Sequence, residues 1–186
     1  FEVIGAPKKI SPKSSIKAMQ VLGPAQEVLY LTSTSMDRQA INHPETNCLI
    51  GRIFIVVMAV NNLQKNKIYY LQKMMLESQG NLSIPVDILS SAQNKDQNYR
   101  YNISVLTMLE RGNKIELDEY DRKYSINKIR SDNFPQGISM ITFEVNDIDE
   151  FNLNFFDIPR EIYPGFKSAV FLGPNDERWE LLSKIS

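Results

Sequence analysis

The chain has 186 residues, 42% of them hydrophobic, and its 21 basic residues nearly balance its 22 acidic ones. This length suits one domain or one and a half, with enough apolar residues for a core. A net charge of −1 shows no basic excess, so we expect no nucleic-acid partner.

Residues 1–33 are predicted to form three strands, and part of this segment recurs near the end of the chain. Residues 21–33 (VLGPAQEVLYLTS) nearly repeat residues 171–183 (FLGPNDERWELLS) without a gap. A repeat of this length indicates a chain built from copies of one structural unit. Because no first strand or helix precedes the three strands, we expect residues 1–33 to be the last strands of an incomplete unit. We therefore expect the natural protein to be longer.

A linker is predicted at residues 34–50, and it contains the only histidine, His43, and the only cysteine, Cys48. We expect His43 to be an exposed linker residue, and nothing around Cys48 marks it as a nucleophile. A lone cysteine cannot form an internal disulfide and fits a reducing compartment, so we expect a cytoplasmic protein.

A complete unit of strand, helix and three strands is predicted over residues 51–120. The apolar run at 53–60 (IFIVVMAV) is rich in β-branched residues and too short for a transmembrane helix, which needs about 20 residues. The apolar run therefore predicts a buried strand at 51–60. We also expect no membrane partner. A helix at 61–77 is predicted from a stripe at mostly three- and four-residue spacing, formed by Leu63, Lys67, Tyr70, Leu71, Met74 and Met75. The predicted strands that follow are 84–90, 102–109 and 114–120, the last two joined by a Gly-Asn hairpin turn.

A second complete unit is predicted over residues 137–186, after a polar linker at 121–136. It begins with a strand at 137–145 and a short helix at 147–156, which Asp147 can cap. The three closing strands are predicted at 160–163, 166–172 and 178–183. Strand alternation places Trp179 on the opposite face from Glu180, so we expect Trp179 to pack beneath the helices.

Three segments give the chain its resemblance to a known family. Residues 51–75 resemble an opening strand and helix that reaches an aromatic pair, here Tyr69 and Tyr70. Residues 110–117 (ERGNKIEL) and 173–181 (GPNDERWEL) resemble a closing hairpin whose strand ends in Glu-Leu. In this order and repetition, the motifs resemble the vicinal oxygen chelate superfamily, which includes glyoxalase I, bleomycin-resistance proteins and extradiol dioxygenases.

The resemblance implies an α+β fold of paired βαβββ modules, with a curled mixed sheet around a cleft and the helices outside. It implies that residues 51–186 form one glyoxalase-like domain of two modules, 51–120 and 137–186, facing each other across that cleft. Residues 1–33 would belong to a preceding module, and a homodimer or a missing N-terminal segment would be a partner.

Metal-dependent members of this superfamily carry ligands on the first and last strands of each module. In this sequence the last-strand positions fall at Tyr30, Glu116 and Glu180, and the first-strand positions fall at Ile55 and Met140. A one-residue slip of the alignment gives Phe54 or Ser139 instead. Because none of the first-strand residues is a usual ligand for a divalent metal, we expect no catalytic metal site. The absence of Walker and Rossmann motifs predicts no nucleotide cofactor, and we expect no cofactor at all.

Three functions remain open at this point. The first is the binding of a small molecule in an apolar cleft, with Ile55, Met140 and Tyr30 at its walls and Glu116 and Glu180 as polar anchors. The second is a metal-dependent lyase or dioxygenase, which would need a different strand alignment, or ligands from a missing upstream module or another subunit. The third is a structural or regulatory domain whose cleft has collapsed. Whether the protein is an enzyme is left open.

Overall fold

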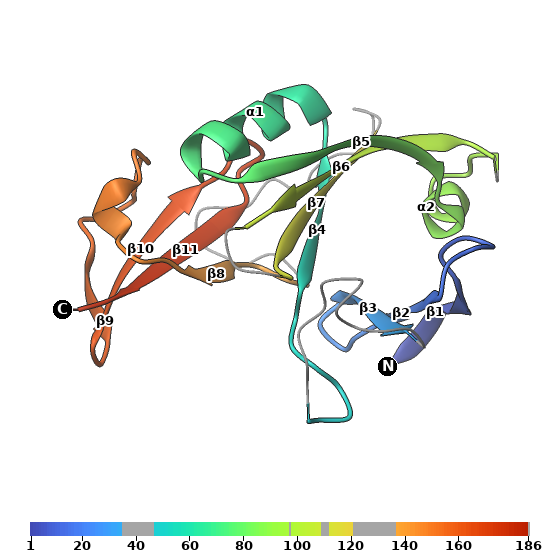
Figure 1. Cartoon of the computed structure of the whole chain (residues 1–186), viewed down its shortest axis with the longest axis horizontal. Helices are drawn as coiled ribbons and strands as arrows, with labels where there is room; N and C mark the ends of the chain where they lie inside the picture. The colour runs from blue at the N-terminus through green and yellow to red at the C-terminus, as the bar shows by residue number, and fades with distance from the viewer. Residues whose placement is uncertain (35–46, 97, 109–111, 121–136, 186) are drawn as a thin grey trace.

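The computed structural model describes residues 1–34, 47–96, 98–108, 112–120 and 137–185. They form an α+β fold in which three separate sheets dominate. In Figure 1 the C-terminal sheet lies at the left, the middle sheet in the centre and the N-terminal sheet at the lower right. The three sheets are open, with three or four strands each, so the predicted α+β class is confirmed.

The middle sheet and its helices form the first complete unit. Its strands run in the order β4-β7-β6-β5, with β4 parallel to β7 and the other pairs antiparallel. The elements of this unit are β4 (Ile55–Val60), α1 (Leu63–Lys73), β5 (Glu77–Pro85), α2 (Asp87–Ala92), β6 (Arg100–Thr107) and β7 (Lys114–Glu119). Helix α1 begins where the Asn62 side chain accepts a hydrogen bond from the Lys65 N–H at 2.9 Å.

The C-terminal sheet repeats this topology. Its order is β8-β11-β10-β9, again with the first strand parallel to the last. Its elements are β8 (Ile141–Glu144), the short 3₁₀ helix η1 (Ile148–Glu150), β9 (Arg160–Tyr163), β10 (Phe166–Leu172) and β11 (Arg178–Lys184). The Asp147 side chain accepts from the Asp149 N–H at 3.0 Å, which confirms the predicted cap.

The N-terminal sheet has the same arrangement without a first strand. Its order is β1-β2-β3, and its strands are β1 (Glu2–Lys9), β2 (Ile16–Leu22) and β3 (Val28–Thr34). The β2–β3 and β10–β11 hairpins share one register, since Lys17 faces Ser33 just as Lys167 faces Ser183. The sequence repeat is therefore a repeat of structure.

The two hairpins also share one turn. Gly23 donates its N–H to the Glu27 carbonyl at 2.8 Å, and Gly173 does the same to Glu177 at 2.8 Å. In both turns a non-glycine residue lies in the left-handed region, with φ of 67° at Gln26 and 64° at Asp176. A matching turn of this kind follows from the shared Gly-Pro sequence and the spacing to the glutamate.

The predicted opening strands 51–60 and 137–145 are shorter in the structure, as β4 and β8, and three other predicted elements differ from it. Residues 84–90 are not one strand, because β5 ends at Pro85, which has no N–H for a further ladder bond, and α2 follows. Helix α1 ends at Lys73, before the predicted 77, because Met75 turns the chain with a φ of 53°. The third difference is the helix predicted at 147–156, of which only η1 forms.

The helix stops after η1 because the burial of the side chains that follow changes from helical spacing to alternation. After η1 the side chains of Phe151, Leu153 and Phe155 are half-buried, whereas Asn152 and Asn154 between them are exposed. This alternation is the pattern of an extended segment. The chain can therefore bury its aromatic residues here without completing a helix.

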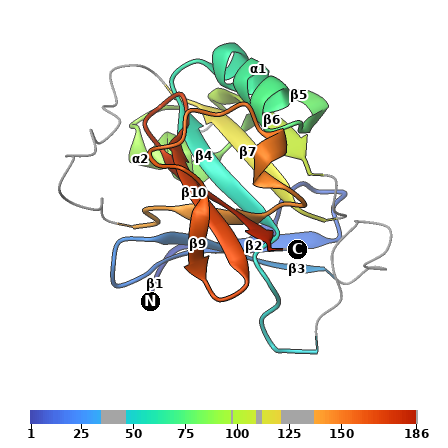
Figure 2. The ribbon, with the colours of Figure 1, turned by 90° about the vertical axis from the view of Figure 1, so that its left-hand side faces the viewer.

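One hydrophobic core joins the middle and C-terminal sheets. Its buried members come from both sheets and from α1: they include Val60, Leu63, Tyr70, Met74, Leu106, Ile115, Leu117, Ile148, Phe171, Trp179 and Leu181. Figures 1 and 2 both show α1 at the opposite end of the molecule from the N-terminal sheet. The middle sheet therefore has α1 on one face and faces the N-terminal sheet with the other.

Candidate functional site

The two faces of the middle sheet have different chemistry. Ile115 and Leu117 of β7 point into the core shared with α1. Their neighbours Glu116 and Asp118 must lie on the opposite face, because successive side chains of a strand alternate. Val57 of β4 is the cross-strand partner of Glu116. The same alternation along β4 puts Ile55, two residues before Val57, on this face.

Tyr30 of the N-terminal sheet lies close to this acidic face. Burial raises the pKa of Tyr30 to about 12, and the charges of Asp118 and Glu116 add to the shift. A coulombic effect of this kind requires the phenol to be near both carboxyl groups. The structure thus brings together Tyr30 and Glu116, which the sequence repeat places at equivalent strand positions.

Glu116 and Asp118 act as one titrating pair. The two side chains are hydrogen-bonded to each other, and burial raises the pKa of both. The pKa of Asp118 is raised to about 8, first by burial and then by the neighbouring Glu116 charge and the hydrogen bond. For Glu116 the hydrogen bond and the charge of Lys114 partly oppose the effect of burial. Burial and the closeness of the two carboxyl groups therefore favour a protonated carboxyl in this pair.

Two more tyrosines border the carboxyl pair. Tyr101 is 1% exposed, and its ring centroid lies 6.3 Å from that of Tyr120. Burial raises the pKa of Tyr120, and the charges of Asp118, Tyr30, Tyr101 and Glu116 add to it in that order. These five side chains form the carboxyl–tyrosine cluster: Tyr30, Tyr101, Glu116, Asp118 and Tyr120.

The carboxyl–tyrosine cluster contains polar atoms without a partner. Asp118 is 3% exposed, and neither its Oδ1 atom nor the hydroxyl of Tyr101 has a hydrogen-bond partner in the structure. A buried polar atom without a partner costs about 1–3 kcal/mol, so native proteins rarely keep one without a reason. These two atoms are the clearest sign of a site for a bound molecule.

A hollow leads from the surface to the tyrosines of the cluster. It has a volume of about 250 Å³, and it opens where β6 begins and β7 ends. Its lining residues are Asn61, Tyr99, Arg100, Tyr101, Asn102, Glu119 and Tyr120. Glu119 is held in place, because it accepts hydrogen bonds from the Leu63 N–H at 3.0 Å and from Asn102 Nδ2 at 3.0 Å.

Glu180 lies elsewhere. It is buried on the face of the C-terminal sheet opposite Trp179, where Ser168 and Thr142 donate their hydroxyls to its two oxygens at 2.6 Å each. Trp179 points to the core around α1, as predicted, so Glu180 points away from that core. Glu116 also points away from it, on a different sheet. The side chains that act on the pKa of Glu116 are Asp118 and Lys114, and Glu180 is not among them.

Met140 lies beside the C-terminal sheet. It directly precedes β8, the strand in which Thr142 pairs with Glu180. Alternation puts Met140 on the same side as Thr142 and Glu180, so it belongs with that face. Of the five residues expected at the site, Glu116 and Ile55 share one face of the middle sheet, and Tyr30 of the N-terminal sheet lies near Glu116. Glu180 and Met140 belong to a face of the C-terminal sheet.

The sequence missed three members of the cluster: Asp118, Tyr101 and Tyr120. Asp118 could have been suspected, because it stands two residues after Glu116 on the same strand and so shares its face. Nothing in the sequence indicated that Asp118 would be almost fully buried. Tyr101 is on β6 and Tyr120 directly follows β7, and these two segments meet only because the strands pair in the sheet.

A buried polar hub in the core has a structural explanation. Tyr70 of α1 donates its hydroxyl to the Glu177 carboxylate and accepts from the Trp179 indole at 3.1 Å. Burial and the adjacent Glu177 raise the pKa of Tyr70, which keeps the phenol protonated as a donor. The hub attaches α1 to the turn of the C-terminal sheet, and every member has a partner.

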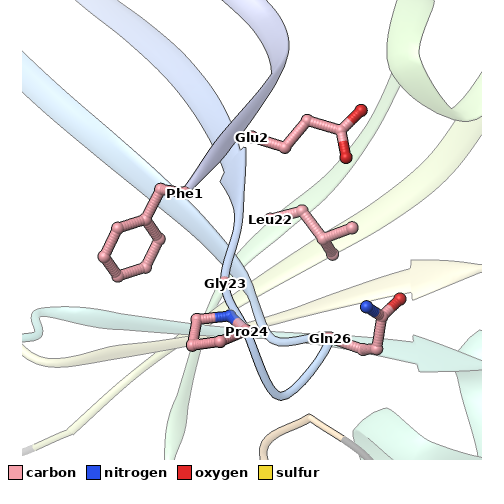
Figure 3. A pocket seen from close by; sticks show the side chains of 6 residues that line it. All are labelled: Phe1, Glu2, Leu22, Gly23, Pro24 and Gln26. Carbon is pink, nitrogen blue, oxygen red and sulfur yellow. The ribbon is translucent and has the colours of Figure 1, made fainter.

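A second hollow, of about 340 Å³, lies on the N-terminal sheet and is mostly apolar. Figure 3 shows that the ring of Phe1 and the carboxylate of Glu2 point to opposite sides of β1. The other lining residues are Leu22, Gly23, Pro24 and Gln26. No set of polar groups converges here, so the carboxyl–tyrosine cluster is the better candidate.

Other groups that could carry chemistry are not assembled in the described residues. No three His, Cys, Asp or Glu side chains gather there in a way that could hold a metal ion. His43 lies outside the described residues, and Cys48 is exposed. No helix of the described segments has the length and hydropathy to cross a membrane.

Comparison with solved structures finds the same architecture in glyoxalases. A glyoxalase family protein from Bacillus cereus is 15% identical, with a TM-score of 0.59, and the match covers 77% of this chain and all of that one. One from Enterococcus faecalis is 16% identical, with a TM-score of 0.52, covering 71% and 97% of the two chains. Glyoxalase I from Zea mays is 14% identical, with a TM-score of 0.58.

The maize match covers 98% of this chain, which spans 59% of the maize enzyme's length. No family model and no curated protein matches the sequence. At these identities the comparisons concern the fold alone, and they agree with the repeated units seen in the three sheets. The chain has the fold of these glyoxalase family proteins.

Proposed function

We propose that this chain binds a small molecule at the carboxyl–tyrosine cluster, without using a metal ion to hold it. The observation that carries the proposal is the pair of unpartnered atoms, Asp118 Oδ1 and Tyr101 Oη, both on nearly fully buried side chains. A ligand group between them would supply the missing hydrogen bonds. Binding would thereby remove the free-energy penalty of leaving these two buried atoms without hydrogen bonds.

The surroundings of the two atoms suit a ligand site. A hollow of about 250 Å³ reaches Tyr101 and Tyr120 from the surface. Ile55, Val57 and Ala59 line the same face of the middle sheet. The hollow itself is lined by polar and aromatic side chains, which can fix the orientation of a small ligand.

The donor set argues for an organic ligand. Glu116 and Asp118 are two hydrogen-bonded carboxyl groups, and burial raises the pKa of each. A tight zinc or iron site needs about three protein ligands, usually with nitrogen or sulfur donors. The described residues place no His or Cys at this pair. We therefore propose binding, and not metal-dependent catalysis, as the role of the cluster.

A fragment screen by ligand-observed NMR tests the proposal. The full chain is compared with the variants Asp118→Asn and Glu180→Gln. We expect hits that bind the wild type and Glu180→Gln equally but lose up to about tenfold in affinity with Asp118→Asn, since one hydrogen bond contributes about 0.5–1.5 kcal/mol. Glu180→Gln is a matched control, because it changes an equivalent strand position on a different face.

Two results would contradict the proposal. Hits that depend on Glu180 and not on Asp118 would place the site on the C-terminal sheet. The absence of any hit that responds to Asp118→Asn would favour a cluster that only stabilises the contact between sheets. Circular dichroism and urea unfolding establish that each variant is folded before its binding is compared.

A further inference from the structure

We infer that the N-terminal sheet binds a further strand and helix along β3, and that the natural protein supplies both from residues upstream of Phe1. This inference is independent of the proposed function. It rests on three differences between the N-terminal sheet and the C-terminal sheet: an open strand edge, a partly uncovered apolar face and an exposed lysine whose counterpart binds a helical turn.

The edge of β3 is open where the other two sheets have a strand. In the middle sheet β4 lies parallel to β7, and in the C-terminal sheet β8 lies parallel to β11. Strand β3 closes its unit as β7 and β11 close theirs, yet in the described part of the chain it pairs only with β2. An edge strand offers its N–H and C=O groups to another strand. The repeat therefore predicts a strand parallel to β3.

The outer face of the N-terminal sheet, which points away from the middle sheet, is apolar and only partly covered. Tyr30 points towards the middle sheet, so Leu29 and Leu31 point outwards. Val21 shares the outer face, because it lies opposite both Leu29 and Val3. Val21 is buried, but Leu31 is 37% exposed and Val3 is 58% exposed. Figure 2 shows this sheet at the bottom of the molecule, with no helix of the described residues beneath it.

The C-terminal sheet shows what covers the equivalent face. Trp179 and Leu181, the equivalents of Leu29 and Leu31, are 2% and 0% exposed. Both pack in one core with Ile148 of η1, the helical turn that follows β8. A strand paired with β3 would lead into a helix at the corresponding place. An amphipathic helix there would bury the exposed apolar side chains of the outer face.

Lys17 gives the bound helix a charge preference. Its equivalent, Lys167, has its Nζ atom 2.9 Å from the carboxylate of Asp149 in η1. The two lysines stand at the same point of the shared register, opposite Ser33 and Ser183. Lys17 is exposed on the outer face. An acidic side chain in the first turn of the bound helix would be stabilised by Lys17 and by the helix dipole.

The order of the elements identifies the source of the strand and helix. In both complete units the first strand and the helix precede the three strands that close the unit. The corresponding position for the N-terminal sheet is upstream of β1. A second copy of the described segments has no such strand to give, because β4 and β8 are already paired with β7 and β11. The occupant is therefore an upstream segment of the natural protein.

The bound strand would also reach the carboxyl–tyrosine cluster. In the two parallel pairs, Val57 lies opposite Glu116 and Thr142 lies opposite Glu180. A strand in the same register with β3 places one side chain opposite Tyr30, on the face that is turned towards Glu116. The upstream segment would therefore add a wall to the candidate site.

Hydrogen exchange measured by mass spectrometry tests the inference. The 186-residue chain is compared with the same chain extended by the residues that its gene encodes upstream of Phe1. We expect the β3 amides to exchange about tenfold more slowly in the extended protein, because a new strand forms hydrogen bonds along their edge. The β11 amides should not change, since β8 already covers that edge.

Two variants of the extended protein test the helix. Leu31→Asp places a charge on the outer face, and Val28→Asp places one on the other face of the same strand, where exposure is similar at 37% and 42%. Leu31→Asp should return β3 exchange to the rate of the 186-residue chain, since a charge is costly to bury beneath a helix. Val28→Asp should keep the protection. Circular dichroism establishes that both variants are folded.

Each outcome decides the inference. The upstream sequence should hold an apolar strand and then an amphipathic helix with an acidic first turn, and a gene without such a segment would overturn the inference. Equal exchange of β3 in both proteins would overturn it as well. Protection of β3 through a dimer of the 186-residue chain would make a second copy the occupant instead. Protection that survives Leu31→Asp would rule out the helix on the outer face.

Discussion

The β2–β3 and β10–β11 hairpins have the same turn and register but different surroundings. Glu27 is half-buried and accepts from the Ala25 N–H at 2.8 Å, whereas the equivalent Glu177 also receives the buried Tyr70 hydroxyl. Leu31 is 37% exposed, whereas the equivalent Leu181 is 0% exposed. The difference arises because α1 covers one hairpin and not the other.

The comparison shows that an equivalent strand position does not imply an equivalent role. Tyr30 and Glu180 occupy the same place in the repeat. Tyr30 lies near the Glu116 and Asp118 carboxyls of another sheet, and Glu180 is bound by Ser168 and Thr142 of its own sheet. The local sequence builds the hairpin, and the sheet or helix opposite determines what each side chain does.

Removing the aromatic residue at one position of the repeat should show the largest contrast. Trp179→Ala deletes a buried ring that stacks on Phe143 and donates to Tyr70, so we expect a loss of about 3–5 kcal/mol in the free energy of unfolding. The equivalent Leu29→Ala removes a half-buried side chain and should cost about 1 kcal/mol. Urea unfolding measures both, and equal losses would contradict the asymmetry.

The pH dependence of stability should distinguish the carboxyl pair from other acidic groups. The pKa of Asp118 rises from its ordinary value of 3.8 to about 8 on folding, so the folded state holds a proton that the unfolded state releases. The contribution of Asp118 to the free energy of unfolding should therefore be largest below about pH 4. Between about pH 4 and pH 8 this contribution should fall by up to about 1.4 kcal/mol per pH unit.

Urea midpoints of the wild type and Asp118→Asn across this range measure the effect. The variant cannot lose the proton, so its stability should fall less steeply with pH. We expect the stability of Asp118→Asn to rise relative to that of the wild type as the pH increases. Parallel pH profiles of the two proteins would show that Asp118 is not the group that titrates.

The smallest effect should come from the shared turn. Gln26 and Asp176 both have positive φ, which a long side chain tolerates less well than Asp or Gly. Gln26→Gly should therefore stabilise the protein by about 0.5 kcal/mol, and Asp176→Gly should change it by less. Thermal unfolding can compare the two variants. A clear loss of stability in Gln26→Gly would show that the turns are not equivalent.

The sequence by itself determined the unit, its repetition and most of its strands. Three strands of the C-terminal sheet were predicted to within a residue, because their alternation and their turns are local. The repeat predicted matching hairpins, and both the register and the turn confirm this. The alternation of β11 also placed Trp179 beneath α1, since a strand's two faces follow from its backbone alone.

Only the tertiary structure decided which faces meet. The apolar faces of the middle and C-terminal sheets share one core with α1, and the partner that comes close to Glu116 is Tyr30 of the N-terminal sheet. Burial of the larger apolar area governs that choice, and it involves side chains far apart in the chain. The same packing turns Glu116 towards Tyr30 and buries Asp118 beside it, and so creates a site whose members no local pattern connects.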